Sequence, residues 1–470
     1  MSTEPNINQI FRQCVPYAVH RLTFTLQFKN GLAAGDGNFG NEMLFARNGK
    51  GELVLRGTSI AGVLRNSYEK QYGEENTELF FGTSAGKNIE DDELSKSPLI
   101  VSDVVLDCGQ NKNDNETKEY RRTHHLRNRH TGSVLDNGLY SIEIAPPKTT
   151  AQVTLWFNET EQLKELGKDF LENLAALIQN CLIFGGNSNR GVGLATANEF
   201  VHKCYELQKK SEYAEYLNDH FAWRNDKTLN NGEPLQPANN VATQNLCVQF
   251  TLQIPRGQDL LIAEGNDMLP HKIRAADGNE YYLLPGSTLH GLFRNWITRL
   301  AAREGKFVSD SVDNYEEKQR NITGAELGWM FNEKLDVKKI GIKKFDKSYP
   351  VESLFGSLHK AGRLHFSDAL CPVNQAVTQH RKHVALDAVS GGAIDSLLFD
   401  NDVLIKGSFD VTMIVRDVKD YEAKWLAKTL KALHIGLLRV GSSKAAGRLE
   451  LAGNLQAAGN FADYFDTITL

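Results

Sequence analysis

Several features are scarce or missing in this chain of 470 residues, and each absence excludes a class of protein. No apolar run reaches the roughly 18 residues that a transmembrane helix needs. The start, Met1 to Gln13, lacks the hydrophobic core of a secretory signal. The six cysteines lie far apart without a CxxC pair, which argues against a structural zinc site or a disulfide framework. That usage fits a reducing cytosol, so we expect a cytoplasmic protein without a membrane partner.

A strong net charge is missing too, so composition gives no general sign of nucleic-acid binding. Lys plus Arg total 53 and Asp plus Glu total 58, which leaves a formal charge of −5. A chain of this kind can bind an anionic polymer only where its basic residues are concentrated. The ten residues Arg121–His130 hold four Arg and three His with no acid, and His380–His383 is a weaker basic stretch. Such segments either bind phosphates and stack on unpaired bases or form solvated loops.

What the chain does contain is an internal repeat, which decides its domain organisation. Several segments recur in the same order. The pairs are Leu22–Phe28 with Cys247–Ile254, Asn41–Leu44 with Asn266–Leu269, Gly57–Asn66 with Gly286–Asn295, Leu79–Gly82 with Leu354–Gly356, and Leu182–Leu194 with Leu437–Leu449. The insertions fall near Gly109–Glu119 in the first copy and near Arg303–Ser348 in the second. We therefore expect two related domains, 1–208 and 244–470, joined by a polar linker over 209–243.

The order of elements within each copy predicts the fold class. A strand with alternating apolar residues is followed by a helix, further strands, a second helix and a glycine-rich loop. This order fits a βαββαβ unit. The sequence therefore predicts an α+β protein made of two tandem ferredoxin-like domains.

Glycine-rich loops close both copies and are candidates for phosphate contact. Gly185–Gly193 carries two amide side chains and Arg190, and Gly441–Gly447 carries Lys444 at the matching place. Glycine lets backbone N–H groups approach a phosphate closely. The other interpretation is a tight turn between helix and strand. Neither loop has the spacing of a P-loop or of a Rossmann fingerprint.

The helix starts at Gly57 and Gly286 are a second candidate for anion binding. Helix N-termini present unpaired N–H groups and a partial positive charge. Arg56, Arg65 and Arg294 lie close by in sequence and would reinforce that charge. Ordinary helix capping is the alternative.

Three carboxylates are candidates for metal binding or for acid–base chemistry. Asp36 lies in a Gly/Asn segment after the first strand, while Glu42 and Asp267 occupy matching places before the repeated helix. A single carboxylate near a phosphodiester can hold Mg²⁺ that keeps several waters, or can orient a ribose 2′-OH. Each of the three is otherwise a turn residue.

Taken in order, these motifs resemble the RAMP superfamily of CRISPR-associated proteins. The most specific pieces are Pro285–Gly291, Leu354–Ser357 and Gly362–Asp368. The resemblance covers nearly all of both halves, and the linker and insertions fall outside it. More narrowly, the chain resembles the backbone subunit of type III effector complexes in a fused two-domain form, as a type III-D complex would use.

The resemblance implies both a fold and an activity. Each domain would have an RRM-like palm that grips guide RNA. A β-hairpin thumb, expected within Arg121–Ile144 and His380–Phe399, would interrupt the guide–target duplex. A loop aspartate would support Mg²⁺-dependent cleavage of the target RNA, in which the 2′-OH attacks the adjacent phosphate and leaves a cyclic phosphate. The implied partners are guide RNA, target RNA and other effector subunits, adjacent RAMP backbone proteins among them.

The resemblance and the repeat disagree about the acid of the first half. Asp267 stands where the family places its loop aspartate, but the residue that matches it in the first half is Glu42. A loop aspartate is the family's usual choice, which favours Asp36 and Asp267 as catalytic and metal-binding residues. Glu42 is the third catalytic candidate. A non-catalytic scaffold, and a guide-processing endonuclease with a His-centred site and no metal, remain alternatives.

The expected RNA contacts come from the helix starts, the basic segments and the two glycine loops. They are Arg56, Ser59, Arg65, Arg121, Arg122, His125, Arg127, Arg129, Gly186, Asn187, Ser188, Arg190, Ser287, Arg294, Arg381, Lys382, Gly441, Ser442 and Lys444.

Overall fold

The structure is a computed structural model that describes most of the chain. The described residues are 16–39, 42–83, 96–109, 120–127, 134–164, 166–180, 182–186, 188–225, 227–229, 231–239, 245–263, 269–305, 349–357, 360–387, 389–441, 447–466 and 468. Within these ranges only the backbone is described at residues 36–39, 120, 125–127, 134–138, 162, 188 and 395–399.

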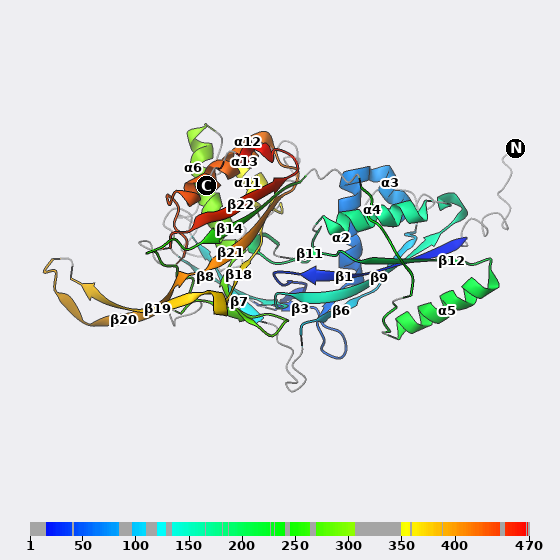
Figure 1. The fold of residues 1–470 in the computed structure, drawn as a ribbon, viewed down its shortest axis with the longest axis horizontal. Coiled ribbons are helices and arrows are strands. Elements are labelled where there is room, and N and C mark those ends of the chain that lie inside the picture. The colour runs from blue at the N-terminus through cyan, green and yellow to red at the C-terminus, as the bar shows by residue number, and fades with distance from the viewer. Residues whose placement is uncertain are drawn as a thin grey trace.

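The first half is built on an antiparallel sheet whose core helices lie on one face (Figure 1). The strands of this half are β1 (Ala18–Phe28), β2 (Gly35–Phe39), β3 (Glu42–Phe45), β4 (Val54–Leu55), β5 (Leu99–Val101), β6 (Val104–Asp107), β7 (Tyr120–Arg127), β8 (Val134–Ile144), β9 (Thr149–Glu159), β10 (Leu182–Ile183), β11 (Leu194–Thr196) and β12 (Phe200–Glu206). Its helices are α2 (Gly57–Tyr72), α3 (Glu74–Phe81) and α4 (Gly167–Gln179).

The second half repeats this plan with its own sheet and its own helices. Its strands are β14 (Leu246–Gln253), β15 (Lys272–Arg274), β16 (Glu280–Leu284), β17 (Leu364–Phe366), β18 (Ala369–Pro372), β19 (Val377–Leu386), β20 (Ala393–Lys406), β21 (Ser408–Val415) and β22 (Glu450–Ala458). Its helices are α6 (Gly286–Arg303), α11 (Pro350–Phe355), α12 (Asp420–His434) and α13 (Asp463–Asp466).

Strand order confirms the ferredoxin-like prediction in both halves. In the second half the sheet runs β17-β21-β14-β22. Along the chain, α6 follows β14, the first of these strands, and α12 follows β21, the third. In the first half β5 pairs with β9, β9 with β1 and β1 with β12, all antiparallel. These are the pairings of a βαββαβ unit, so the two halves share one topology.

The repeated helix buries the same face in each half because its apolar residues recur every four positions. In α2 these are Ile60, Leu64 and Tyr68. In α6 they are Leu289, Phe293 and Ile297. Each set joins the hydrophobic core between its own sheet and helices. Residues at this spacing lie on one side of a helix, so the pattern read from the sequence gives the packing directly.

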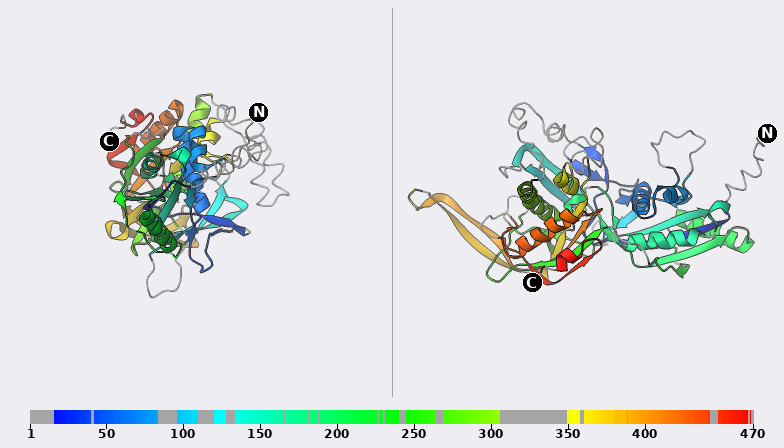
Figure 2. Two further views of the ribbon diagram at one scale, coloured as in Figure 1. Left: turned by 90° about the vertical axis from the view of Figure 1, so that its right-hand side faces the viewer. Right: turned by 90° about the horizontal axis from the view of Figure 1, so that it is seen from above.

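A hairpin is inserted at the same point of each half, before the third core strand. In the first half β7 and β8 form it and join β2 and β3 in a small separate sheet. In the second half β19 and β20 form a long two-stranded hairpin that projects away from the molecule (Figures 1 and 2). The predicted thumb segments are therefore hairpins.

The segment 209–243 was expected to be a polar linker, but its described residues form secondary structure that packs on the first half. It contains α5 (Lys210–Arg224) and β13 (Glu233–Pro234), and β13 pairs with β12. Helix α5 lies on the face of the first sheet that α2 and α4 leave open (Figure 1). Its Tyr216 and Trp223 pack against Trp156. The sequence showed no amphipathic pattern here, because Leu217 and Phe221 are exposed while Tyr216 and Trp223 face the sheet.

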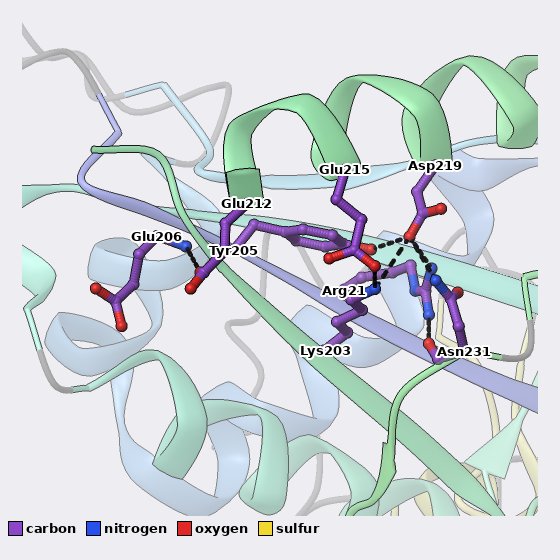
Figure 3. A network of polar contacts seen from close by, with 8 residues as sticks. All are labelled: Arg21, Lys203, Tyr205, Glu206, Glu212, Glu215, Asp219 and Asn231. Atoms are coloured by element: carbon purple, nitrogen blue, oxygen red, sulfur yellow. Dashed lines mark hydrogen bonds and ion pairs between the residues drawn. The ribbon is translucent and has the colours of Figure 1, made fainter. Parts of the chain in front are cut away.

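Polar contacts complete the attachment of α5 (Figure 3). Arg21, fully buried on β1, donates to Asp219 at 3.2 Å, and Tyr205 donates its hydroxyl to the same carboxylate at 2.6 Å. Burial would raise the pKa of Asp219, but the hydrogen bonds from Tyr205 and Asn231 and the charges of Lys203 and Arg21 hold it below its usual value. In the described residues, no helix is both long enough and apolar enough to cross a membrane.

Candidate functional site

The two hairpins share one register, which identifies equivalent residues in the two halves. Leu32 bridges Ala145 beside the first hairpin, and Leu260 bridges Leu404 beside the second. When cross-strand pairs are counted outward from these two bridges, the pair Arg122↔Ile142 of the first hairpin matches the pair Arg381↔Asn401 of the second. The neighbouring pair, Arg121↔Glu143, aligns with His380↔Asp402.

The aligned cross-strand pairs join a basic to an acidic side chain in both hairpins. Arg121 Nη2 lies 3.3 Å from Glu143 Oε1, and His380 Nδ1 lies 2.9 Å from Asp402 Oδ1. Opposite charges facing each other across two strands stabilise a hairpin modestly. The basic side chains of both segments thus have acidic neighbours that the sequence segments alone did not show.

The candidate acid Glu42 belongs to the small sheet of the first hairpin. It begins β3, which runs parallel to β8, and its Oε1 lies 3.3 Å from Arg121 Nη1. Asp36 lies on β2 of the same sheet, and only its backbone is described. Asp267 lies outside the described residues. The structure therefore places Asp36, Glu42 and Arg121 on one sheet.

A metal centre is not formed by the side chains that the structure describes. Among them, no three His, Cys, Asp or Glu side chains gather closely enough to hold a metal ion. The expected metal residues, Asp36 and Asp267, are outside that search because their side chains are not described. The expectation of Mg²⁺ stays a prediction.

Arg122 has a position different from the one its basic segment suggested. Its side chain is 4% exposed, and its Nη2 lies 2.5 Å from Asp368 Oδ2 in the other half. Its Nη1 donates to Asp368 Oδ1 at 3.3 Å and to the carbonyl of Arg190 at 3.2 Å. Arg122 therefore holds the two halves together and is not on the surface.

The remaining basic residues of the two hairpins differ in how much of them is described and exposed. Arg121 is 55% exposed and Lys382 is exposed, so both can meet a nucleic acid. Arg381 is half-buried and pairs with Asp259. His125 and Arg127 lie on β7 with only their backbone described, and Arg129 lies outside the described residues.

The glycines at the base of each closing loop have a structural reason. Phe184 N–H donates to Gly193 O at 2.8 Å, and Val440 N–H donates to Gly447 O at 2.8 Å. Gly185 and Gly441 have φ of 76° and 106°, and a Cβ on either would meet a backbone carbonyl oxygen at 2.2 Å or 2.4 Å. Only glycine fits such positions without strain. The tight-turn interpretation therefore explains the base of both loops.

The tips of the loops are described only in part. Gly186 is exposed, and its N–H donates to Ala33 O at 2.8 Å. Ser188 is described by its backbone, while Asn187, Ser442 and Lys444 lie outside the described residues. Phosphate contact at these tips stays a prediction.

Arg190 at the end of the first loop turns toward the first hairpin. Its guanidinium carbon lies 4.6 Å from the centre of the Tyr140 ring. Burial, and then the charge of Arg122, lowers the pKa of Arg190 to about 10, so it stays protonated at neutral pH. This cation stacks on the protein's own aromatic ring.

Each repeated helix start already holds an anion, supplied by its own half. Gly57 N–H donates to Asp103 Oδ1 at 2.8 Å, and Gly286 N–H donates to Asp368 Oδ1 at 2.7 Å. A carboxylate at this position satisfies an unpaired N–H group and complements the helix dipole. Capping, the alternative stated for these starts, is what the structure shows at the first N–H group.

These two aspartates are the site residues that the sequence reasoning missed. Each stands two residues beyond a core strand, in Ser102-Asp103 after β5 and in Ser367-Asp368 after β17. The Ser-Asp pair is a further repeated motif that a longer comparison of the two copies would have found.

The repeated arginines of the same helices serve the far end of another helix. Arg65 Nη1 donates to Gly82 O at 2.7 Å and to Phe81 O at 3.2 Å. Arg294 Nη2 donates to Gly356 O at 3.1 Å. Arg65 and Arg294 lie two helical turns beyond the start of their own helix, so they are too far along to reinforce it. They satisfy the last carbonyls of α3 and α11 instead. Arg56 and Ser59 are exposed at the start of α2, and Ser287 is half-buried at the start of α6.

A cleft of about 860 Å³ lies between the halves. Its wall on the second sheet presents amide and hydroxyl side chains, among them Gln249, Thr251 and Thr412. Lys29 and Lys148 come from the first half. Lys148 is held by Asp277 of the second half at 2.6 Å, so the cleft is bordered by a second contact between halves.

Comparison with known families assigns the chain. No curated protein matches it in a sequence search. The family model of the RAMP superfamily matches residues 25–196 and 257–450, one stretch in each half. The unmatched stretch between them includes α5 and β13. Two ferredoxin-like units with hairpins in one register agree with this double match, and the family points to an RNA-binding subunit of a CRISPR system. The chain is a member of the RAMP superfamily.

Proposed function

We propose that the chain is the guide-RNA-binding backbone subunit of a type III CRISPR effector complex, with two fused RAMP domains that cleave complementary target RNA. The observation that carries this proposal is the repeated hairpin. Both halves place one at the same point of the same fold, and their cross-strand pairs share a register. Two equivalent projections on one chain suit a ligand that itself repeats, such as a guide–target duplex.

The RNA-binding part of the proposal rests on exposed cations close to the hairpins. Arg121 and Lys382 are accessible on equivalent hairpins, and Arg56 is exposed at the start of α2. Each would contact a backbone phosphate, which releases counterions and gives salt-dependent affinity. Arg122 lies in the interior, so it supports the surface without touching RNA.

For the chemistry, the proposal assigns Asp36 and Asp267 as holders of Mg²⁺ and Glu42 as a further catalytic candidate. The ribose 2′-oxygen attacks the adjacent phosphorus and the bond from phosphorus to the 5′-oxygen breaks. The products are a 2′,3′-cyclic phosphate and a 5′-hydroxyl, with the 2′-OH proton lost and a proton gained by the leaving oxygen. A bound Mg²⁺ would neutralise charge on the phosphate.

A non-catalytic RNA scaffold is the second candidate, and one observation favours it. Glu42 is paired with Arg121, which reduces the negative charge that this carboxylate offers to a cation.

The experiment that separates these functions is target cleavage by the assembled complex. Asp36→Ala, Glu42→Ala and Asp267→Ala are each assembled with guide and labelled target RNA in Mg²⁺. Asp463→Ala, an exposed acid on α13, is the matched control. Loss of individual cuts with unchanged guide binding supports the nuclease. If the wild-type chain does not cut the target, the result supports a non-catalytic scaffold. Cutting of precursor guide RNA in EDTA indicates a processing enzyme.

A further inference from the structure

Helix α5 has apolar side chains on two sides, and the sheet accounts for only one of them. The inner side packs against Trp156. The outer side carries an exposed stripe with an apolar residue at every fourth position, made of Tyr213, Leu217 and Phe221. We name it the α5 stripe. Residues four apart lie one above another on a helix, so the α5 stripe is one continuous apolar strip. Phe221 alone is 73% exposed.

The sheet beside α5 exposes apolar side chains on the same face. Ile100 on β5 is the cross-strand partner of Trp156 on β9, which α5 covers, so both side chains point to the α5 side. On β6, Val104 and Leu106 are buried in the core, so Val105 between them also points to the α5 side. Ile100 and Val105 are both exposed.

The α5 stripe lies on the flank of the helix that is turned away from β12 and toward β5. On the opposite flank, Glu215 pairs with Lys203 of β12 (Figure 3). Successive helical residues are rotated by about 100°, which sets Leu217 roughly 160° away from Glu215. Strand β12 lies on one side of β1, while β9 and then β5 lie on the other. The α5 stripe, Ile100 and Val105 therefore border one surface, which we name the apolar face.

The first residues of the chain, which lie outside the described ones, have a sequence that suits this surface. Apolar residues stand at i, i+3, i+4, i+7 and i+8, namely Ile7, Ile10, Phe11, Cys14 and Val15. The positions between them are polar. This spacing predicts an amphipathic helix. Pro5 and Pro16 stand where prolines commonly begin and end helices.

The chain enters the first sheet at the end where α5 begins. Tyr17 N–H donates to Glu159 O at 2.7 Å, and Tyr17 O accepts from Leu207 N–H at 3.3 Å, three residues before α5 starts. A helix that leads to Tyr17 and lies beside α5 must therefore run antiparallel to α5. The apolar positions 7 to 15 span about 12 Å in a helix, which is also the length of the α5 stripe.

We propose that residues 7–15 form a helix that packs on the apolar face, antiparallel to α5. Burial of apolar side chains from both sides favours this contact, and a segment tethered next to its binding surface docks at high effective concentration. Neither the segment nor α5 lies within the family-matched stretches, so the proposal goes beyond RNA binding and cleavage. Its tests use no RNA, so the proposal and the proposed function can fail separately.

Hydrogen exchange of the purified full chain, followed by mass spectrometry, tests the contact. In the wild type, the amides of residues 7–15 should exchange at least about tenfold more slowly than those of an unstructured peptide of the same sequence. Leu217→Asp puts a charge on the α5 stripe and should remove this protection. Asn218→Asp puts the same charge on the neighbouring exposed position, off the stripe, and should retain it. Thermal unfolding establishes that both variants are folded.

Labelling of Cys14 with a maleimide gives a second measurement. Cys14 stands on the apolar side of the predicted helix, so it should react at least about tenfold faster in Phe11→Asp than in the wild type. Gln9→Asp changes the polar side of the same segment and should leave the rate unchanged. Cys204, which is exposed on β12, is the internal reference for changes that are not specific to the contact.

Three results would overturn the proposal. Wild-type residues 7–15 that exchange as fast as the unstructured peptide would exclude a docked helix. Protection that survives Leu217→Asp would place the segment on another surface. Protection that grows with protein concentration would show that a second copy, and not the chain's own segment, occupies the apolar face.

Discussion

The two ferredoxin-like sheets differ in what covers the face that their core helices leave open. In the first half, residues Ala18 to Phe24 of β1 are all buried, because α5 packs on the second face. In the second half, β14 alternates buried and more exposed residues along its whole length, and its polar face lines the cleft. The same topology is thus a three-layer unit in one half and a two-layer unit in the other.

This difference comes from a segment between the two family-matched stretches. The cover α5 lies in that segment, while β9 of the first sheet and β21 of the second lie within the matched stretches. Aromatic residues on β9, β12 and α5 fill the additional layer, whereas amides and hydroxyls occupy the matching place on the second sheet. Whether the second face of the central strand is buried therefore depends on α5, which lies outside the repeated segments.

The largest expected effect comes from breaking the additional layer. Trp156 is 1% exposed and contacts Tyr205, Tyr216 and Trp223, so Trp156→Ala should cost about 3–5 kcal/mol of unfolding free energy. Gln249→Ala on the open second sheet should change it by less than about 0.5 kcal/mol. Urea unfolding measures both. Similar losses at the two positions would mean that the second face is also packed.

A comparable effect is expected at the contact between the halves. Asp368→Ala leaves Arg122 buried without its partner, which costs about 3–5 kcal/mol. Asp103→Ala removes only a helix cap, at about 1 kcal/mol. Calorimetry should show the halves of Asp368→Ala unfolding at separate temperatures and those of Asp103→Ala unfolding together. Equal losses for the two variants would mean that Asp368 contributes no more to stability than the helix cap Asp103 does.

Each half also holds a histidine that should make stability depend on pH. Burial, and then the charges of His20, Lys168 and Arg21, lowers the pKa of His202 to about 4. Burial and the charge of Arg294 lower that of His290 to about 3. Below its ordinary pKa of about 6.5 the unfolded chain binds a proton that the folded chain does not, so stability falls as pH drops from 6.5 toward 4. His202→Asn and His290→Asn should each flatten this fall in pH-dependent unfolding, and an unchanged slope would contradict the assignment.

The smallest effects should come from the repeated helix-end contacts. Among the described residues, Arg65 donates two hydrogen bonds to carbonyls and Arg294 donates one, so Arg65→Ala and Arg294→Ala should each cost about 1–2 kcal/mol. Matched losses in thermal unfolding would support equivalent roles. A loss of RNA affinity with unchanged stability would restore the anion-binding role first expected of these residues.

Sequence alone could predict the parts of the structure that follow from local pattern. The repeated segments, among them the strands, the apolar spacing of α2 and α6 and the glycine loops, predicted both the repeat and the fold. It could not predict the pair Arg122–Asp368, because those residues are 246 positions apart and meet only through the docking of the halves. Helix α5 was missed for a similar reason, since its apolar residues follow no one-sided pattern and Tyr216 and Trp223 meet Trp156 only through the folded sheet. The assignment of the catalytic acids stays a prediction, because the side chains of Asp36 and Asp267 are not described.

The central claim is that two RAMP domains of one chain hold a single guide RNA. Sequencing the RNA that co-purifies with the full chain from cells tests it most directly. The account predicts RNA of a narrow length class, each molecule a spacer sequence joined to a repeat-derived tag, and a reduced yield with Arg121→Ala plus Lys382→Ala. Recovery of no RNA, or of RNA that mirrors the bulk cellular pool, would contradict it.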